Sequence, residues 1–563
     1  MNILGINYIF HDSSACIVKD GELIVALEDE RFTRDKHSQK FPVSAIEESL
    51  RFANMTIEEI DHIALSVNPG KNTAEKLAFA SKLNGGSKTF IEYEFHRLRE
   101  RHLGFWTWFH EHFPDDQAKK PEVHFIDHHL AHIAGSYFVS PWDKAALLSI
   151  DGWGEWTTTW MGVAEKSDIQ CLNESVFPHS LGVFYSAATE FCGFKPNYDE
   201  GKTMGLAPMG DPMKYYNLVK DMVKISPEGQ VKIDLSWFGF QTLSGKLCSD
   251  KFYEYFGPAR EGNSPIDDNH KDIAAAFQLV LEEKVLEICE ILGQKTNAKH
   301  LVLGGGVALN SVMNGRIIRE TQFEDIYVMP GAGDNGTCIG AAYQLYNGML
   351  GETKRYHHID PYMGTEYSDD AIIAALKDAK LKYRHTSDVF NETAEMLSSG
   401  KIVGWFQGRM EFGPRALGNR SILANPTLPG MKDKINAEVK HREAFRPFAP
   451  SIPVEDKNIY FDIEVDAPFM LKVCSVHENK RDLIPAIVHV DGTARLQTVC
   501  EKTNPRYHKL LKAFGGLTGH PVLLNSSFNV MGEPIVESPL HAIRCFFSTG
   551  LDALVIGDFV VEK

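Results

Sequence analysis

The feature that most limits the fold is an alternation of short apolar segments and polar, often acidic, turns that occurs twice. Residues 3–27 contain an apolar segment, the polar stretch His11-Asp12-Ser13-Ser14 and an apolar hairpin, and residues 145–172 repeat this order. Short apolar runs bounded by turn residues predict strands and hairpins. The repetition is one of pattern and not of identity, and it indicates two similar β-containing units.

Helical and strand-like segments alternate in the following part of the chain. Residues 272–292 carry apolar side chains at helical spacing and lead into the strand-like segment 301–303. Residues 326–329 lead into the glycine-rich loop 331–336 and a helix of small residues over 337–346. This alternation predicts an α/β domain.

The character of the chain changes in its last third. From about residue 401 the sequence predicts mainly strands, among them 402–406, 484–490 and 522–524. We therefore predict an N-terminal domain over 1–355 and a second domain over 385–563. Residues 71–121 predict a helical insertion, whose eight aromatic side chains form either the core of a helical hairpin or the lining of an acceptor pocket.

Charge and composition favour a small-molecule ligand. The formal net charge is −17, which disfavours a nucleic-acid partner, and 43% of the 563 residues are hydrophobic, as expected for packed domains. No apolar run approaches the roughly 18 residues of a membrane span. The nine cysteines are scattered and never spaced C-x-x-C, which disfavours disulfides and thiolate zinc sites. We expect no membrane association and a cytoplasmic location.

Two histidines and two aspartates form a candidate metal site. His128 and His132 in DHHLAH are four residues apart, so a helix presents both imidazoles on one face. Asp151 follows a predicted strand, and Asp334 lies in a glycine-rich loop before a helix. Two His and two Asp suit Fe(II), Mn(II) or Zn(II). The alternatives are that the histidines are a surface pair or satisfied core residues, and that the aspartates cap turns.

Three glycine-flanked segments predict nucleotide contacts. Residues 303–310 read LGGGVALN, residues 331–336 read GAGDNG, and residues 200–205 read EGKTMG, which we interpret as a loop. Glycine lets the backbone approach a phosphate closely, although tight turns need it as well. The candidate nucleotide-binding residues are Lys202, Gly205, Gly304, Gly305, Gly306 and Asn310.

In the last third of the chain, several arginines and lysines lie within apolar or glycine-rich segments. A desolvated guanidinium needs a partner, and in an acidic protein several that converge predict a polyphosphate or acyl phosphate. The alternative, expected for about a third of these arginines, is that they form ion pairs with glutamates and hold loops instead of binding a ligand. The cations are Arg409, Arg415 and Arg420, then Lys440, Arg442 and Arg446, and finally Arg495, with Asn525 and Ser526 as neutral donors.

Taken together, these motifs resemble the O-carbamoyltransferases of the NodU/CmcH type, which include the tobramycin and cephalosporin enzymes. The resemblance covers nearly the whole chain and implies a duplicated actin/Hsp70-like ATPase-superfamily domain followed by a YrdC-like α+β domain. The motifs that carry it are HDSSA, ERFTRDKH, DHHLAH, SIDGWGE, EGKTMGLAPMG, GGGVALN, GAGDNG, GRMEFGPRALGNRSIL, KHREAFRPFAP, DGTARLQTV and NSSFNVMGEPIV.

The resemblance implies a two-step reaction. The second domain converts carbamoyl phosphate and ATP, with Mg(II), into carbamoyl adenylate. The N-terminal domain then transfers the carbamoyl group to a hydroxyl of a small acceptor, such as a natural product or a sugar. Its metal ligands are His128, His132, Asp151 and Asp334, with iron(II) as the ion. His11 and Lys36 act near the carbamoyl group, while the donor phosphates are held by Arg415, Lys440, Arg446, Arg495, Asn525 and Ser526.

Several points remain open from the sequence. Relatives often have threonine where this chain has Ser526, a change that keeps the hydroxyl. An alternative function of a different class is a catalytically silent nucleotide-binding regulator on the same scaffold. The intact candidate metal ligands disfavour this alternative. A homodimer is compatible with the sequence, which does not name the acceptor.

Overall fold

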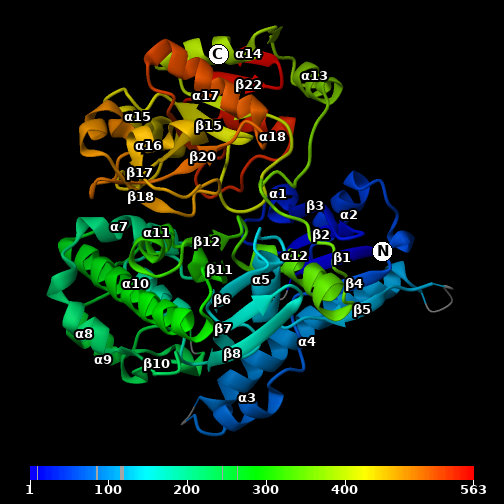
Figure 1. Cartoon of the computed structure of the whole chain (residues 1–563), viewed down its shortest axis with the longest axis vertical. Helices are drawn as coiled ribbons and strands as arrows, with labels where there is room; N and C mark the ends of the chain where they lie inside the picture. The colour runs from blue at the N-terminus through cyan, green and yellow to red at the C-terminus, as the bar shows by residue number, and fades with distance from the viewer. Residues whose placement is uncertain (9, 84–85, 115–118, 244, 263) are drawn as a thin grey trace. The chain divides into compact units, whose positions relative to one another are not determined.

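The computed structural model describes residues 1–563 except 9, 84–85, 115–118, 244 and 263. The chain divides into two compact units, shown in Figure 1. The first contains Met1–Asp29 and His37–His358, and the second contains Glu30–Lys36 and Ile359–Lys563. Both units combine helices with sheets, so the protein is a mixed α/β protein. Among the described residues, no helix is both long and apolar enough to cross a membrane.

The first sheet of the first unit has the order β3-β2-β1-β4-β5. Strands β1 to β3 form an antiparallel meander, and β4 and β5 extend the other side of β1 in parallel. Its strands are β1 (Asn2–Asn7), β2 (Ser14–Lys19), β3 (Glu22–Glu28), β4 (His62–Leu65) and β5 (Glu122–Phe125).

The second sheet repeats this topology, with the order β12-β11-β6-β7-β8. Strands β6 to β8 are an antiparallel meander, and β11 and β12 are parallel to β6. The repeat of sequence pattern therefore corresponds to a repeat of topology. The strands are β6 (Lys144–Ile150), β7 (Thr157–Glu165), β8 (Asp168–Val176), β11 (His300–Gly304) and β12 (Asp325–Val328), beside the small hairpin β9 (Val223–Ile225) and β10 (Val231–Ile233).

Helices α5 and α12 pack against each other closely enough to require glycine. A Cβ at Gly340 would lie 1.7 Å from the carbonyl oxygen of Ala131, and one at Gly135 would lie 3.0 Å from the Cα of Gly340. The unit's helices are α2 (Val43–Phe52), α3 (Thr73–Ala80), α4 (Ser87–His112), α5 (His128–Tyr137), α6 (Leu181–Phe191), α7 (Glu200–Leu206), α8 (Tyr216–Asp221), α9 (Asp250–Phe256), α10 (Asp268–Thr296), α11 (Ser311–Glu320) and α12 (Thr337–Tyr343).

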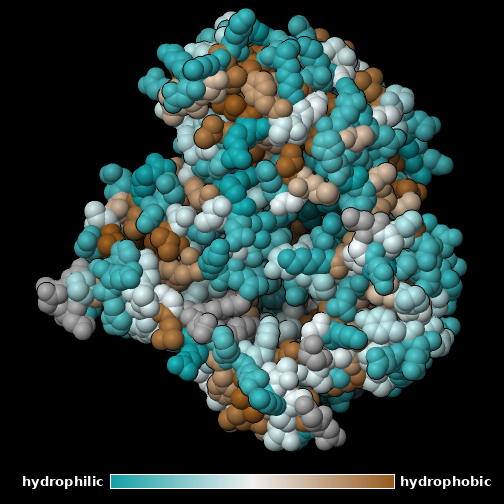
Figure 2. Space-filling view, turned by 180° about the vertical axis from the view of Figure 1, so that it is seen from behind, coloured by the Kyte–Doolittle hydropathy of each residue, from teal (hydrophilic) through white to brown (hydrophobic). Residues whose placement is uncertain are grey.

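The segment predicted as an insertion over 71–121 contains α3 and α4, and its residues 84–85 and 115–118 lie outside the described residues. Five of its eight aromatic side chains are buried, which makes them core rather than pocket lining: Phe90, Phe105, Trp108, Phe109 and Phe113. A buried ion pair joins Lys76 to Glu94 at 3.2 Å. Apolar residues, drawn brown, gather at the lower end of the view in Figure 2. The exposed apolar side chains of α3 and α4 include Leu77 and Leu103.

The second unit is built on an eight-stranded mixed sheet with the order β13-β23-β22-β14-β15-β21-β16-β20, beside the three-stranded sheet β17-β18-β19. Its strands are β13 (Arg384–His385), β14 (Val403–Phe406), β15 (Arg420–Ala424), β16 (Ala449–Pro453), β17 (Phe461–Asp462), β18 (Val473–Val476), β19 (Thr493–Arg495), β20 (Gln497–Val499), β21 (Leu523–Ser527), β22 (Ala553–Ile556) and β23 (Phe559–Glu562). Its helices are α1 (Glu30–Thr33), α13 (Asp369–Asp378), α14 (Val389–Ser398), α15 (Met431–Ile435), α16 (Lys457–Tyr460), α17 (Pro505–Thr518) and α18 (Pro539–Phe547).

The strand predicted over 484–490 is wrong. This segment forms a 3₁₀ turn over Pro485–Ile487, because proline has no N–H to donate to a sheet and its fixed φ suits the first position of a helical turn. Ile484 and Ile487 are nevertheless buried in the core of the second unit. The apolar run was therefore a correct sign of burial but not of a strand.

Segment Glu30–Lys36 belongs to the second unit although it lies early in the chain. Arg31 donates from Nη2 to the carbonyl oxygen of Gly413 at 2.8 Å. Arg34 donates to the carbonyl oxygens of Pro534 and Ile535 at 2.6 and 2.8 Å. These charge-assisted hydrogen bonds hold the segment to two loops of the second unit.

Candidate functional site

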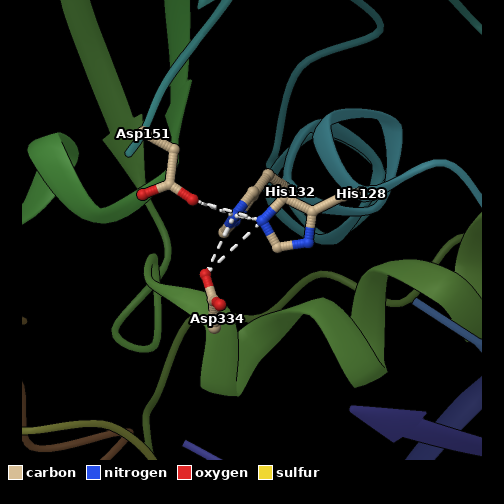
Figure 3. Close-up of side chains that lie close together, drawn as sticks. All are labelled: His128, His132, Asp151 and Asp334. Carbon is tan, nitrogen blue, oxygen red and sulfur yellow. Dashed lines mark hydrogen bonds and ion pairs between the residues drawn. The ribbon is translucent and has the colours of Figure 1, made fainter. Parts of the chain in front are cut away.

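Four buried side chains of the first unit converge on one point (Figure 3). The Nε2 atoms of His128 and His132 are 3.0 Å apart. Asp151 Oδ2 lies 3.2 Å from His128 Nε2 and 3.3 Å from His132 Nε2. Asp334 Oδ1 lies 3.5 Å from each of these nitrogens. One ligand atom from each residue thus lies within 4.8 Å of the others, a spacing that suits one metal ion.

These side chains come from one helix and from two segments that follow strands. His128 and His132 lie one turn apart on α5, so both imidazoles project from the same face. Asp151 directly follows β6, and Asp334 opens the 3₁₀ turn Asp334–Gly336 that leads into α12. The repeated sheet topology explains how residues far apart in sequence meet, because equivalent strand ends deliver them.

The electrostatics of this cluster match a divalent cation. Burial opposes protonation of His128, but Asp334 and Asp151 outweigh it and raise the pKa of His128 to about 10. The pKa values of Asp151 and Asp334 are both lowered, because the histidines outweigh the effect of burial. Asp334 Oδ1 is buried without a hydrogen-bond partner. Two ionised carboxylates and two neutral imidazoles would supply the charge and the donor atoms for an ion such as Fe(II) or Zn(II).

The triple-glycine loop supports Asp151. The backbone N–H of Gly306 donates to Asp151 Oδ1 at 3.1 Å, which leaves Oδ2 to face the histidines. Gly305 has a φ of +86°, and a Cβ there would lie 2.3 Å from the carbonyl oxygen of Ile150. A Cβ at Gly304 would lie 3.0 Å from the carbonyl oxygen of His132. These glycines therefore let the loop pass close to the carboxylate and to α5, a role that the sequence analysis missed.

His11 lies next to the four-ligand cluster. Its Nε2 is 3.7 Å from Asp334 Oδ2, and its Nδ1 lies 2.9 Å from Asp12 Oδ2. The other oxygen of Asp12 lies 2.6 Å from Nδ1 of His37. Burial lowers the pKa of His11, but Asp334 and Asp12 outweigh it and raise the pKa well above the ordinary value. Asp12 therefore orients the His11 ring. Its second contact, with His37, could not be predicted from the sequence, because the two residues are 25 positions apart.

The predicted nucleotide residues are engaged within the first unit. The segment 200–205 is not a loop but part of α7, where Lys202 Nζ lies 3.0 Å from Asp199 Oδ2. The other residues of α7, among them Glu200, Lys202 and Leu206, favour a helix and continue it despite the two glycines. Asn310 caps α11 by accepting from the N–H of Met313 at 3.1 Å, and it exchanges hydrogen bonds with Gln278. Gly205 lies within α7.

Arginines gather in the second unit. Burial and Arg446 lower the pKa of Arg415 to about 10. Burial and Arg446 also lower the pKa of Arg442 to about 9. Burial, Arg415 and Arg442 lower the pKa of Arg495 well below its usual range. The buried Nε atoms of Arg415 and Arg495 have no hydrogen-bond partner in the structure. Several cations that lower one another's pKa favour the binding of an anion.

The other predicted donors of the second unit make hydrogen bonds within that unit. Lys440 Nζ donates to the carbonyl oxygens of Ser527 and Asn529. Burial and Arg442 lower its pKa well below the ordinary value. Asn525 donates to Ser451 and Gln497.

Three further predictions have clear positions. Ser526 lies on β21 opposite Ile422, and its side chain is partly exposed. Arg420 is fully buried and donates to the carbonyl oxygens of Gln407 and Gly408, so it holds a loop through backbone hydrogen bonds and not through the ion pair that was the alternative. Arg409 likewise donates to the carbonyl oxygens of Met363 and Gly364.

Lys36 lies in the second unit and His11 lies in the first, so the two predicted catalytic residues come from different units. Lys36 adds its positive charge to those that lower the pKa of Lys440. Local sequence patterns could not indicate this interaction, because the segment around Lys36 is short and lies far from residue 440 in the chain. Arg442 was named among the cations that predict a polyphosphate or acyl phosphate, but it was not among the donor-binding residues that the family resemblance implies.

A buried carboxylate behind the four-ligand cluster was also missed. Glu155 Oε1 accepts from the backbone N–H groups of His128 at 3.0 Å and Asn68 at 2.7 Å. Burial raises the pKa of Glu155. A carboxylate at the N-terminus of α5 stabilises the first turn and fixes His128. Its place in the turn 151–156 was the signal that could have found it.

The two halves of the chain match two family models. The model described as Carbamoyltransferase N-terminus matches residues 2–343, and the model described as Carbamoyltransferase C-terminus matches residues 394–563. Together they cover most of the chain.

Individual relatives match over most of their length. The chain is 40% identical to an uncharacterized protein of Synechocystis sp., covering 100% of this chain and 97% of that protein. It is 35% identical to nodulation protein NolNO of Sinorhizobium fredii, covering 99% and 80%. It is 33% identical to 3'-hydroxymethylcephem-O-carbamoyltransferase of Amycolatopsis lactamdurans, covering 65% of each chain.

Proposed function

Since the chain belongs to the carbamoyltransferase family, we propose that it forms carbamoyl adenylate from carbamoyl phosphate and ATP and transfers the carbamoyl group to a hydroxyl of a small acceptor. The observation that carries this proposal is the group of mutually repelling arginines at Arg415, Arg442, Arg446 and Arg495. A site of this kind favours donors that bring several negative charges, as a carbamoyl phosphate with ATP does.

The duplicated sheets of the first unit support its assignment to the actin/Hsp70-like superfamily. We assign the second unit to the YrdC-like class on the resemblance of its motifs. In this unit, water releases phosphate from carbamoyl phosphate. An oxygen of the resulting carbamate attacks the α-phosphorus of ATP, supplied with Mg(II), and pyrophosphate leaves. The guanidinium groups orient the anions and offset their charge.

Transfer takes place in the first unit. The acceptor's hydroxyl oxygen bonds to the carbamoyl carbon, the bond from that carbon to the adenylate oxygen breaks, and AMP leaves with the electron pair. Asp12 holds Nδ1 of His11 and leaves Nε2 directed toward Asp334, so Nε2 is the proposed acceptor of the hydroxyl proton. The raised pKa of His11 requires that a cation first offset the charge of Asp334, so that the ring is neutral when the acceptor binds. Lys202, Gly205 and Asn310 are proposed to shape the nucleotide side of this unit. For Lys36, which belongs to the second unit, we propose a role in polarising the carbonyl of the carbamoyl group.

His128, His132, Asp151 and Asp334 would hold a divalent ion, for which we propose Fe(II). When bound, the ion supplies positive charge that offsets the charge on the departing phosphate. The chain's own contribution is the fixed geometry: Gly306 and Glu155 hold Asp151 and His128 in place, so the ligand atoms need little rearrangement.

The test is turnover with carbamoyl phosphate, ATP, Mg(II) and Fe(II), in which pyrophosphate is followed while sugar, aminoglycoside and macrolide acceptors are added. We expect pyrophosphate release that depends on carbamoyl phosphate, and an acceptor whose mass rises by one carbamoyl group in place of hydrogen. Arg446→Ala should abolish the release, whereas Arg544→Ala, which changes an exposed arginine, should not. A protein that releases no pyrophosphate under any condition would instead be a nucleotide-binding regulator.

A further inference from the structure

Three potential ligands meet at the edge of the first sheet, outside the site described above. Glu122 and His124 lie two residues apart on the edge strand β5, so their side chains project from the same face. In the parallel pairing of β4 with β5, His62 lies opposite Glu122. Side chains that are paired across neighbouring strands share a face. The register therefore brings two imidazoles and one carboxylate together.

The distances fit one ion. His62 Nδ1 lies 3.1 Å from His124 Nε2. Two nitrogens bound at about 2.0 to 2.1 Å to a tetrahedral ion lie only slightly farther apart than this. Glu122 Oε2 lies 3.8 Å from each of the two nitrogens, and its flexible side chain can close that distance.

The surroundings favour binding from solvent. The side chains of His62 and His124 are 16% and 10% exposed, while that of Glu122 is 71% exposed, so an ion can enter from the carboxylate side. The neighbouring Asp61 is already bonded to Lys119 at 2.8 Å and to the N–H of Asn2 at 2.9 Å. The charge of Lys119 is therefore matched by Asp61 and does not oppose a cation at the histidines.

We propose that His62, His124 and Glu122 form a second site for a divalent first-row ion such as Zn²⁺, with water in the remaining position. Two imidazoles, one carboxylate and a water are a donor set that zinc accepts. The ion would tie the edge strand β5, which follows α3 and α4 in sequence, to β4. This inference goes beyond the proposed function and does not depend on it.

The experiment counts zinc bound by the full-length protein in equilibrium dialysis at a concentration that just saturates the wild type. We expect two equivalents for the wild type and one for His124→Gln or Glu122→Gln. Asp151→Asn should lose the other equivalent, and Asp151→Asn with Glu122→Gln should lose both. His385→Ala is the matched control, because His385 is exposed on β13 and should leave the count unchanged.

The outcomes separate the two sites. Glu122→Gln alters a side chain that is 71% exposed, so it tests the ligand without disturbing the core. The proposal is overturned if Glu122→Gln and His124→Gln both keep the wild-type zinc count. It is also overturned if the wild type binds one equivalent that only Asp151→Asn removes. Failure of carbamoyl transfer would leave this zinc count unaffected.

Discussion

Replacing Arg415 by methionine should stabilise the ligand-free protein and weaken donor binding at the same time. Methionine keeps much of the aliphatic volume and removes the charge. The pKa of Arg415 falls from 12.5 to about 10, first because of burial and second because of Arg446. One pKa unit corresponds to about 1.36 kcal/mol, so the upper bound on the cost of this charge is about 3 kcal/mol. Partial exposure screens it, and we expect the free energy of unfolding to rise by about 1 to 2 kcal/mol.

The sign of this effect follows from proton linkage. A base whose folded pKa lies below its unfolded pKa carries its full penalty at every pH below the folded value. For Arg415 that value is about 10, so the gain in the variant should not change across neutral pH. Donor binding moves in the opposite direction, because a hydrogen bond to a charged group contributes about 1.5 to 3 kcal/mol. The affinity for carbamoyl phosphate should therefore fall about 10- to 150-fold.

Urea denaturation in phosphate-free buffer measures the first effect, and calorimetric titration with carbamoyl phosphate measures the second. Arg544→Met, at an exposed arginine of α18, is the control and should change neither. A variant at Arg415 that loses stability and keeps its donor affinity would refute the reasoning, since it would make Arg415 a structural residue.

Three other changes test other parts of the molecule. Asp151→Asn should weaken binding of a divalent ion in dialysis by more than about 100-fold, since even outer-shell changes cost about 10- to 100-fold, and it should leave pyrophosphate release intact. Gly305→Ala should lower the free energy of unfolding in urea by about 1 to 3 kcal/mol, because φ is +86° and the new Cβ would lie 2.3 Å from the carbonyl oxygen of Ile150; unchanged stability would contradict this. Burial, with Arg34 and Arg544, lowers the pKa of His541 from 6.5 to about 4, so the unfolded chain binds more protons than the folded chain between these pH values. The free energy of unfolding should therefore fall as the pH drops from about 6.5 to about 4. Urea titrations at successive pH values should show that His541→Gln flattens this slope.

The elements that local pattern specifies could be predicted. The spacing of His128 and His132 needed only helical periodicity, and the placing of Asp151 after a strand needed only the end of an apolar run. Long-range contacts could not be predicted this way. Nothing local to Arg34 indicates that it bonds to the carbonyl oxygens of residues 534 and 535, which lie 500 and 501 positions later in the chain. The helix around Lys202 was missed because its two glycines, which have low helix propensity, were interpreted as a loop. Tertiary packing can override the low helix propensity of glycine.

The two candidate sites carry opposite charge, and this gives the proposed reaction a direction. Asp12, Asp151 and Asp334 surround His11 in the first unit, so an anionic donor is repelled there unless a cation offsets the carboxylates. The second unit attracts the same donor through arginines that repel one another and are relieved when an anion binds. In the proposed reaction, activation of the donor would therefore belong to the second unit. Transfer would belong to the first, where His128, His132, Asp151 and Asp334 would hold a divalent ion that offsets the carboxylate charge and lets His11 serve as the base.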